Sequence, residues 1–235
     1  MTKIIGILGG MGPLATVKFF EKIVLNTKAS KDQDHPKIIV VNNTKIPDRT
    51  DGILLKGSSP LDELIKSAQL LEKSGADFIV MPCNTAHYYY KEITNNINIP
   101  FYNMLSETLK YIKDKYGNEK IGLLATTGTV KSKVYETEAE KLRIDLELPN
   151  EHQQQKIMDY IYDIKKNDFS SKLGEFLSVI EDMKKSGIKA FIFGCTELSV
   201  VIGIHDLNKF APCIDPMDIL ADISIVESGC IKLND

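Results

Sequence analysis

The stretch GADFIVMPCNT at residues 75–85 returns in altered form as GIKAFIFGCT at residues 187–196. In both copies a glycine precedes an apolar run, and the run leads to a cysteine that small polar residues follow. A short apolar run without polar alternation is typical of a strand buried on both faces of a parallel sheet. The repeat therefore predicts two equivalent strands, one leading to Cys83 and the other to Cys195.

A second repeat lies ahead of the first in each half of the chain. IGILGGMG at residues 5–12 is echoed by IGLLATTG at residues 121–128, and the distances to the cysteines are similar, 77 residues from Gly6 to Cys83 and 73 from Gly122 to Cys195. We therefore expect two pseudo-symmetric α/β domains. The first comprises residues 1–103 plus 213–235 and the second residues 104–212, with a helix after Cys213 that returns to pack on the first half.

Short apolar runs alternate along the chain with longer segments of helical periodicity. The predicted strands are 4–8, 38–41, 78–81, 121–124 and 190–193, and the predicted helices are roughly 14–28, 60–74, 104–116, 130–142, 152–166 and 171–186. Strands that alternate with helices predict an α/β fold. We expect each domain to be a parallel sheet flanked by helices, with the active site in the cleft between the two domains.

The composition excludes several kinds of partner. Of the residues, 43% are hydrophobic and 26% charged, and the formal net charge is -3 without a basic stripe, which argues against nucleic acid or an anionic membrane as partner. No stretch has the character of a signal peptide or a membrane span, so a cytoplasmic protein is expected. The four cysteines are then expected to be thiols, and their spacing predicts no metal site.

Cys83 and Cys195 suggest a specific chemistry. In open α/β sheets, ligands bind beyond the carboxyl ends of the strands, so facing halves would aim two thiols at one ligand. Inverting an α-carbon requires a base on one face and an acid on the other, and a thiol can serve as either. A lone apolar-flanked cysteine is more often a small core residue, but an equivalent pair favours catalysis. Cys213 and Cys230 have no counterpart in the repeat and are interpreted as structural.

Several polar residues beside the strand ends are further candidates. Asn84, Thr85 and Thr196 follow the two cysteines and could bind a carboxylate together with backbone N–H groups. The loop from Gly9 to Pro13 fits a dinucleotide pattern only weakly, since no acidic residue follows the next strand, and favours a small carboxylate instead. His87 could tune the Cys83 thiol or pack on its helix, and both interpretations stay open.

The sequence resembles the aspartate racemases of the aspartate/glutamate racemase family from end to end. The resemblance rests on GILGGMGPLAT (6–16), NNTKIPDRT (42–50), GADFIVMPCNTAH (75–87), GLLATTGT (122–129), GCTELSVV (194–201) and IDPMDILA (214–221). It implies a homodimer that uses neither pyridoxal phosphate nor a metal, with Cys83 and Cys195 catalytic and Cys195 serving the L enantiomer. The implied substrate contacts are Met11, Arg49, Asn84, Thr85, Thr129, Lys166 and Thr196, with Lys165 as the alternative second cation.

Two departures from glutamate racemases favour aspartate over glutamate as the substrate. Those enzymes typically carry Asp-Ser where this chain has Gly10-Met11, and Cys-Thr-His where it has Cys195-Thr196-Glu197. Glu197 is expected to act as a base or hydrogen-bond partner of Cys195, although a helix N-terminal acid without a catalytic part is the alternative. The prediction is an enzyme that interconverts L- and D-aspartate, with glutamate left open as a further substrate.

Three other classes of function compete with this prediction: another enzyme of the same superfamily, a sensor and a redox switch. Hydantoin racemase, maleate isomerase and arylmalonate decarboxylase belong to the same superfamily, but arylmalonate decarboxylases usually have one of the two cysteines, and Arg49 with Lys166 counts against hydantoins. A non-catalytic amino-acid sensor would be expected to lose a cysteine. In a thiol redox switch, Cys83 and Cys195 would form a disulfide.

Overall fold

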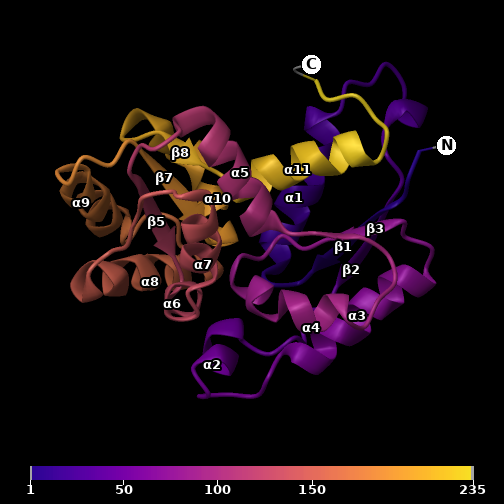
Figure 1. Ribbon diagram of the computed structural model, residues 1–235, viewed down its shortest axis with the longest axis horizontal. Coiled ribbons are helices and arrows are strands. Elements are labelled where there is room, and N and C mark those ends of the chain that lie inside the picture. Colours follow the sequence, from indigo (N-terminus) through magenta and orange to yellow (C-terminus); the bar gives the residue numbers. More distant parts are fainter. Residues whose placement is uncertain (1, 234–235) are drawn as a thin grey trace. The chain divides into compact units, whose positions relative to one another are not determined.

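Two four-stranded parallel sheets organise the chain in the computed structural model, which describes residues 2–233 (Figure 1). Their strand orders are β2-β1-β3-β4 and β6-β5-β7-β8. The strands are β1 (Ile5–Gly9), β2 (Ile38–Asn42), β3 (Phe78–Val80), β4 (Phe101–Tyr102), β5 (Ile121–Ala125), β6 (Leu146–Glu147), β7 (Ala190–Gly194) and β8 (Cys213–Ile214). The predicted α/β class and the predicted parallel sheets are confirmed.

The chain divides into two compact units. The first runs up to Glu107 and resumes at Met217, and the second is Thr108–Pro216. The sequence predicted that the chain passes from one domain to the other at 103/104 and returns at 212/213. The first domain as predicted also included Met1, Asn234 and Asp235, which lie outside the described residues. Helix α5 (Met104–Tyr116) carries the chain from the first unit to the second, and α11 (Pro216–Glu227) begins its return.

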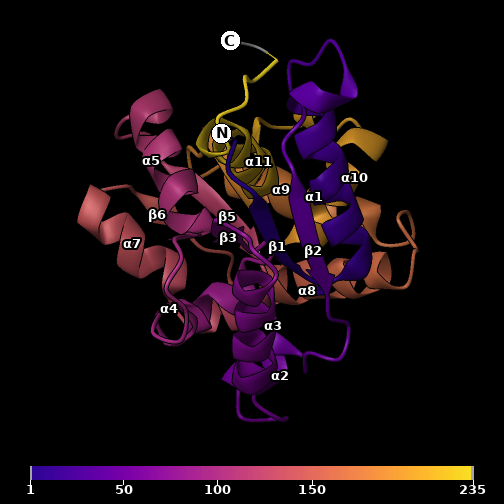
Figure 2. The same cartoon turned by 90° about the vertical axis from the view of Figure 1, so that its right-hand side faces the viewer.

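The first unit packs helices on both faces of its sheet. Helices α3 (Leu61–Lys73) and α4 (Tyr90–Thr94) lie on one side of β1 and β3, and α1 (Pro13–Asn26) and α11 lie on the other (Figures 1 and 2). Leu64, Ala68 and Leu71 recur at helical spacing and are buried in the core with the strand residues. Two short helices, α2 (Arg49–Ile53) and the 3-10 helix η2 (Thr85–Tyr89), follow the carboxyl ends of β2 and β3.

The second unit repeats this plan with α6 (Thr127–Lys131), α7 (Val134–Leu142), α8 (Glu151–Lys165), α9 (Leu173–Lys184) and α10 (Thr196–Ile204). Helix α8 begins with a capping box, in which the Asn150 and Gln153 side chains each accept from the other's backbone N–H. Its inner face packs against α9 and against Phe191 and Phe193 of β7. The core of each unit therefore lies between its sheet and its own helices.

The central strands, the edge strand β2 and the long helices were predicted, and the other three edge strands were not. Strands β4, β6 and β8 are two residues long, too short to produce a hydrophobic period. The predicted helix 130–142 is divided into α6 and α7 because Lys133 adopts left-handed backbone angles, with φ 56°. The predicted helix after Cys213 is α11, and it belongs to the first unit.

The pairing of residues between neighbouring strands shows which residues of the two halves are equivalent. Gly6 of β1 pairs with Ile79 of β3, and Gly122 of β5 pairs with Phe191 of β7. Each catalytic candidate lies four residues after the second member of its pair. Cys83 and Cys195 therefore occupy the same position beyond the carboxyl end of the same strand in two similar sheets.

Candidate active site

Cys83 lies where the chain leaves β3 and enters η2. Its side chain is 5% exposed and belongs to the core cluster of the first unit, as does Met11. Asn84 and Thr85, the next two residues, are also buried. Because β1, β2 and β3 are parallel, the loops that carry Met11, Arg49 and Cys83 all leave the same edge of the sheet. The predicted site residues of the first unit thus share one edge.

Cys195 is the N-cap residue of α10, and its side chain is 4% exposed. Its Sγ donates a hydrogen bond to Oε2 of buried Glu197 at 2.9 Å. Burial raises the pKa of the Cys195 thiol well above its ordinary value, the nearby negative charge of Glu197 raises it further, and the positive charge of Lys165 opposes them. Burial and Glu197 therefore both favour the protonated form of the Cys195 thiol, whose hydrogen bond ends on the Glu197 side chain.

The loops after β1 and β5 are held in place by different local interactions. Gly10 has φ +100°, and a Cβ there would lie 2.3 Å from the carbonyl oxygen of Asn43, so only glycine fits. In the second unit, the Thr126 hydroxyl caps α6 by accepting from the Thr129 N–H at 3.1 Å, and the two hydroxyls lie 3.0 Å apart. Thr129 is fully buried. Both loops hold their backbone close to the strand ends, as a site for a small carboxylate requires.

Arg49 is the first residue of α2, and Asp48 caps that helix. The Arg49 Nη1 donates to the carbonyl oxygens of Ile46 and Pro47 at 3.3 Å and 3.0 Å. These bonds hold a partly buried guanidinium against its own loop, which does not fit a fully solvated loop residue. A planar guanidinium held in this way can still bind a carboxylate through its remaining donors.

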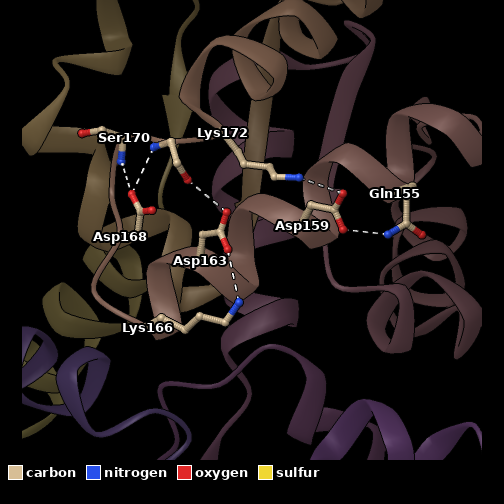
Figure 3. A network of polar contacts seen from close by, with 8 residues as sticks. Gln155, Asp159, Asp163, Lys166, Asp168, Ser170 and Lys172 are labelled. Atoms are coloured by element: carbon tan, nitrogen blue, oxygen red, sulfur yellow. Dashed lines mark hydrogen bonds and ion pairs between the residues drawn. The ribbon is translucent and has the colours of Figure 1, made fainter.

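Lys165 and Lys166 differ in their surroundings. The Lys166 side chain is 72% exposed and pairs with Asp163 at 3.4 Å. Figure 3 shows it in a surface network in which Asp163 also accepts from Ser171 and Lys172 pairs with Asp159. Asp159, Tyr162, Asp163, Lys166 and Lys172 line a surface pocket there. Lys165, by contrast, is the residue whose charge acts on Cys195. The charge of Lys165 on the Cys195 thiol makes it a candidate for the second cation beside Lys166, the residue predicted from sequence.

His87 does not tune the Cys83 sulfur through the contacts seen here. Its ring is buried, and Nδ1 lies 2.8 Å from the carbonyl oxygen of Cys83, while Nε2 accepts from the Met104 N–H at 3.1 Å. The ring thus binds the backbone of the cysteine loop, an arrangement that neither of the two sequence-based interpretations described. The contact joins residues 17 apart in sequence, so no local pattern could have drawn attention to it.

The other two cysteines lie elsewhere in the fold. All four are thiols; Cys213 belongs to edge strand β8, where burial raises its pKa to about 12. Among residues 2–233, His, Cys, Asp and Glu side chains form no group of three or more that could hold a metal ion. No helix in the same range is long and apolar enough to cross a membrane.

Comparison with known proteins adds to this geometry. The family model for Asp/Glu/hydantoin racemase matches residues 8–223. The broad specificity amino-acid racemase RacX of Bacillus subtilis is 29% identical over 231 residues, which cover 94% of this chain and 96% of that protein. The solved structure of the Picrophilus torridus aspartate racemase is 34% identical with a TM-score of 0.87, covering 98% of this chain and 96% of that one. Glutamate racemase from Campylobacter jejuni shares the fold, at 17% identity and a TM-score of 0.69, covering 99% and 88% of the two chains.

Two similar parallel sheets, each with a buried cysteine at the same register position, together with these similarities define an amino-acid racemase, an enzyme of the isomerase class. The family model spans most of the chain, and the Picrophilus torridus enzyme matches nearly all of it. The chain belongs to the Asp/Glu/hydantoin racemase family.

Proposed function

We propose that the protein interconverts L- and D-aspartate, with Cys83 and Cys195 as the two proton-transfer groups. The observation that carries the proposal is the equivalent position of the two thiols in the strand register of the two sheets. When Cys195 acts as base, its thiolate removes the α-proton of L-aspartate, and the Cys83 thiol donates a proton to the opposite face. The products are D-aspartate, a Cys195 thiol and a Cys83 thiolate, and the reverse reaction exchanges the roles.

Glu197 is proposed to generate the Cys195 thiolate. The hydrogen bond from Sγ to Oε2 is the path along which the proton would move to the carboxylate. Burial makes the thiolate costly without such an acceptor, because desolvation disfavours the charged form. Thr196 and the backbone N–H groups at the start of α10 are proposed to bind a carboxylate beside the sulfur.

Arg49 and Lys165 are proposed to bind the two carboxylates of aspartate, and Met11, Asn84, Thr85 and Thr129 to complete the substrate contacts. A dicarboxylate carries one more negative charge than a neutral amino acid, and a desolvated carboxylate needs a cationic partner. The similarity to the Picrophilus torridus aspartate racemase supports this substrate. The similarity to RacX makes a broader set of amino acids the alternative outcome of the substrate test.

Cofactor requirement, location and oligomeric state complete the proposed description of the enzyme. We propose that it works without pyridoxal phosphate, because cysteines supply both proton transfers, and that it is a cytoplasmic homodimer. The exposed apolar face of α1 is proposed as the surface that contacts the second copy.

Serine variants test the two-base mechanism. Cys83→Ser and Cys195→Ser keep the size of the side chain but replace the thiol with a hydroxyl too weakly acidic to act as the base. Each should lose racemisation of aspartate, and each should retain exchange of the α-proton in D2O for one enantiomer only, Cys83→Ser for L-aspartate and Cys195→Ser for D-aspartate. A panel of L- and D-amino acids, including glutamate and alanine, tests the substrate.

Cys213→Ser and Cys230→Ser are the matched controls and should racemise aspartate like the parent. Interconversion of D- and L-aspartate at near-parental rate by either Cys83→Ser or Cys195→Ser would overturn the mechanism.

A further inference from the structure

The contacts of His87 determine the protonation of its ring. The backbone N–H of Met104 can only donate, so Nε2 accepts and carries no proton. Nδ1 must then carry the proton of the neutral ring and donate it to the carbonyl oxygen of Cys83. Burial lowers the pKa of His87 to about 4, so the ring is neutral at physiological pH. His87 therefore links the Cys83 backbone to the first residue of α5.

The second unit contains a matching link. Ser199 lies four residues after Cys195, as His87 lies four residues after Cys83. The Ser199 backbone N–H donates to the carbonyl oxygen of Cys195 at 3.4 Å, and its hydroxyl donates to Oδ1 of Asp215 at 2.6 Å. Ser199 and Asp215 are both buried. The Cys83 carbonyl is thus bound by the His87 side chain, and the Cys195 carbonyl by the backbone N–H groups of Ser199 and, at 2.9 Å, Leu198.

The strand register shows that the far ends of the two links are adjacent positions, Met104 in the first half and the equivalent of Asn103, Asp215, in the second. Ile79 pairs with Phe101 in the first sheet, and Phe191 pairs with Cys213 in the second. Two residues beyond these partners, Asn103 and Asp215 precede the first residues of α5 and α11. Each of these helices begins where the chain leaves one unit for the other. The His87 imidazole therefore joins the Cys83 carbonyl to Met104, whereas in the second half the Ser199 side chain binds Asp215 and its backbone N–H contacts the Cys195 carbonyl.

We propose that His87 and Ser199 are paired positioning residues, each of which couples the backbone of its catalytic cysteine to the start of the helix by which the chain leaves that unit. The proposal rests on the catalytic roles given above to Cys83 and Cys195. Neither side chain needs to touch the substrate; each limits where its sulfur can lie. A residue kept only to fill the core would not need polar bonds at both ends, because buried polar groups are costly unless they are paired.

Variants of His87 can remove one end of the link at a time. The amide of Gln reaches the position of Nε2 and keeps an acceptor for Met104, whereas the amide of Asn reaches the position of Nδ1 and keeps a donor for Cys83. His87→Gln should lower α-proton exchange from D-aspartate, the enantiomer assigned to Cys83, about tenfold relative to exchange from L-aspartate, as expected for losing one hydrogen bond. His87→Asn should preserve more of the exchange from D-aspartate. Ser199→Ala should lower exchange from L-aspartate instead.

Matched controls are His205→Gln and Ser224→Ala. His205 contacts the carbonyl oxygen of Phe169 and Ser224 donates to that of Leu220, so both are hydrogen-bonded without binding a cysteine. Neither control should change the ratio of the two exchange rates. A fall of equal size for both enantiomers in the His87 or Ser199 variants would reduce these residues to structural ones and overturn the proposal.

A second readout does not require catalysis. The rates at which iodoacetamide alkylates Cys83 and Cys195 can be measured separately by mass spectrometry of the native protein. His87→Gln should change the rate at Cys83 several-fold and leave Cys195 unchanged, and Ser199→Ala should do the opposite. If the parent exchanged no α-proton of any amino acid, the proposed function would be wrong, and the alkylation ratio would still test the positioning. Unchanged ratios in both variants would show that the links do not position the sulfurs.

Discussion

Lys165 and Lys166 are neighbours in sequence at the end of α8, yet their charges act on different surroundings. Lys166 pairs with Asp163 on the surface, and Lys165 influences the Cys195 thiol. Lys165→Met should lower kcat/KM for aspartate by a factor of about 10 to 160, equivalent to about 1.5–3 kcal/mol, because a charged hydrogen bond to a carboxylate is lost. Steady-state kinetics with aspartate and with alanine should show that the loss is larger for the dicarboxylate.

Lys166→Met is the matched control, and its kcat/KM for aspartate should stay close to that of the parent. A large loss at Lys166 with none at Lys165 would restore the assignment made from the sequence.

Glu197 has two separable effects on Cys195. Its charge raises the pKa of the thiol, so Glu197→Gln should lower that pKa and move the acidic limb of the kcat/KM profile for L-aspartate to lower pH. The loss of the proton acceptor should at the same time lower the plateau of the profile about tenfold, within the range typical of general base catalysis. The profile should be measured in the L to D direction, in which Cys195 is the base.

Glu151→Gln, a change of another acid in the first turn of a helix, is the control for Glu197 and should leave both features unchanged. A Glu197 variant with a shifted limb and an unchanged plateau would show that the carboxylate tunes the thiol without receiving its proton.

At the level of elements, α1 has two apolar faces. Ala15, Phe19 and Ile23 face the core of the first unit, whereas Leu14, Val17, Phe20, Val24 and Leu25 are exposed. Lys18 and Glu21 form an ion pair beside the exposed stripe. A two-fold interface places the same surface of both copies together, so an antiparallel pair of α1 helices could exchange these charges. This is the physical basis of the proposed homodimer.

Phe20→Asp should convert the proposed dimer into a monomer, because it places a charge in the apolar stripe. Sedimentation velocity of the parent and the variant measures the change. Leu55→Asp is the control, since Leu55 is 90% exposed outside α1 and should leave the assembly intact. A parent that sediments as a monomer at micromolar concentration would contradict the proposed homodimer.

The helices and strands differ in how well a sequence pattern predicts them. Central strands such as β1 and β7 are five residues long and fully buried, so an unbroken apolar run marks them. An edge strand such as β6 has two partly buried residues, and only its pairing with β5 makes it a strand. The division between α6 and α7 depends on the backbone angles of Lys133, a residue that has no sequence signal for a left-handed conformation.

At the level of the whole molecule, His87 predicts a dependence of stability on pH. Its pKa is lowered from 6.5 to about 4 by burial, so between these values the unfolded chain binds a proton that the folded protein does not. The free energy of unfolding should therefore fall as the pH falls from about 6.5 to about 4, by on the order of 3 kcal/mol from this group. His87→Asn should lose this contribution.

Urea denaturation of the parent and His87→Asn at several pH values between 7 and 4 gives the difference between their two pH dependences. His152→Asn, a change of an exposed histidine on α8, should follow the parent. Parallel pH dependences for the parent and His87→Asn would show that the ring is not held neutral in the folded protein.

Much of the candidate site could be predicted from sequence because the chain repeats itself. The repeat places Cys83 and Cys195 after equivalent strands, and the parallel topology then brings Met11, Arg49 and Cys83 to one edge of a sheet. The choice between the two lysines could not be made in this way. No local pattern states which of two adjacent lysines acts on a particular thiol.

The sequence by itself determined the α/β class, the two similar halves, the central strands and the place of each cysteine beyond a strand. These are local or repeated patterns, and a strand buried on both faces can be identified from its unbroken run of apolar residues. Only the tertiary structure decided that His87 binds the Cys83 carbonyl and Met104, that the Cys195 thiol donates to Glu197, and that Ser199 binds Asp215. Such contacts depend on side-chain direction and on the approach of distant segments, because a hydrogen bond forms only when two particular atoms come within about 3 Å at a suitable angle.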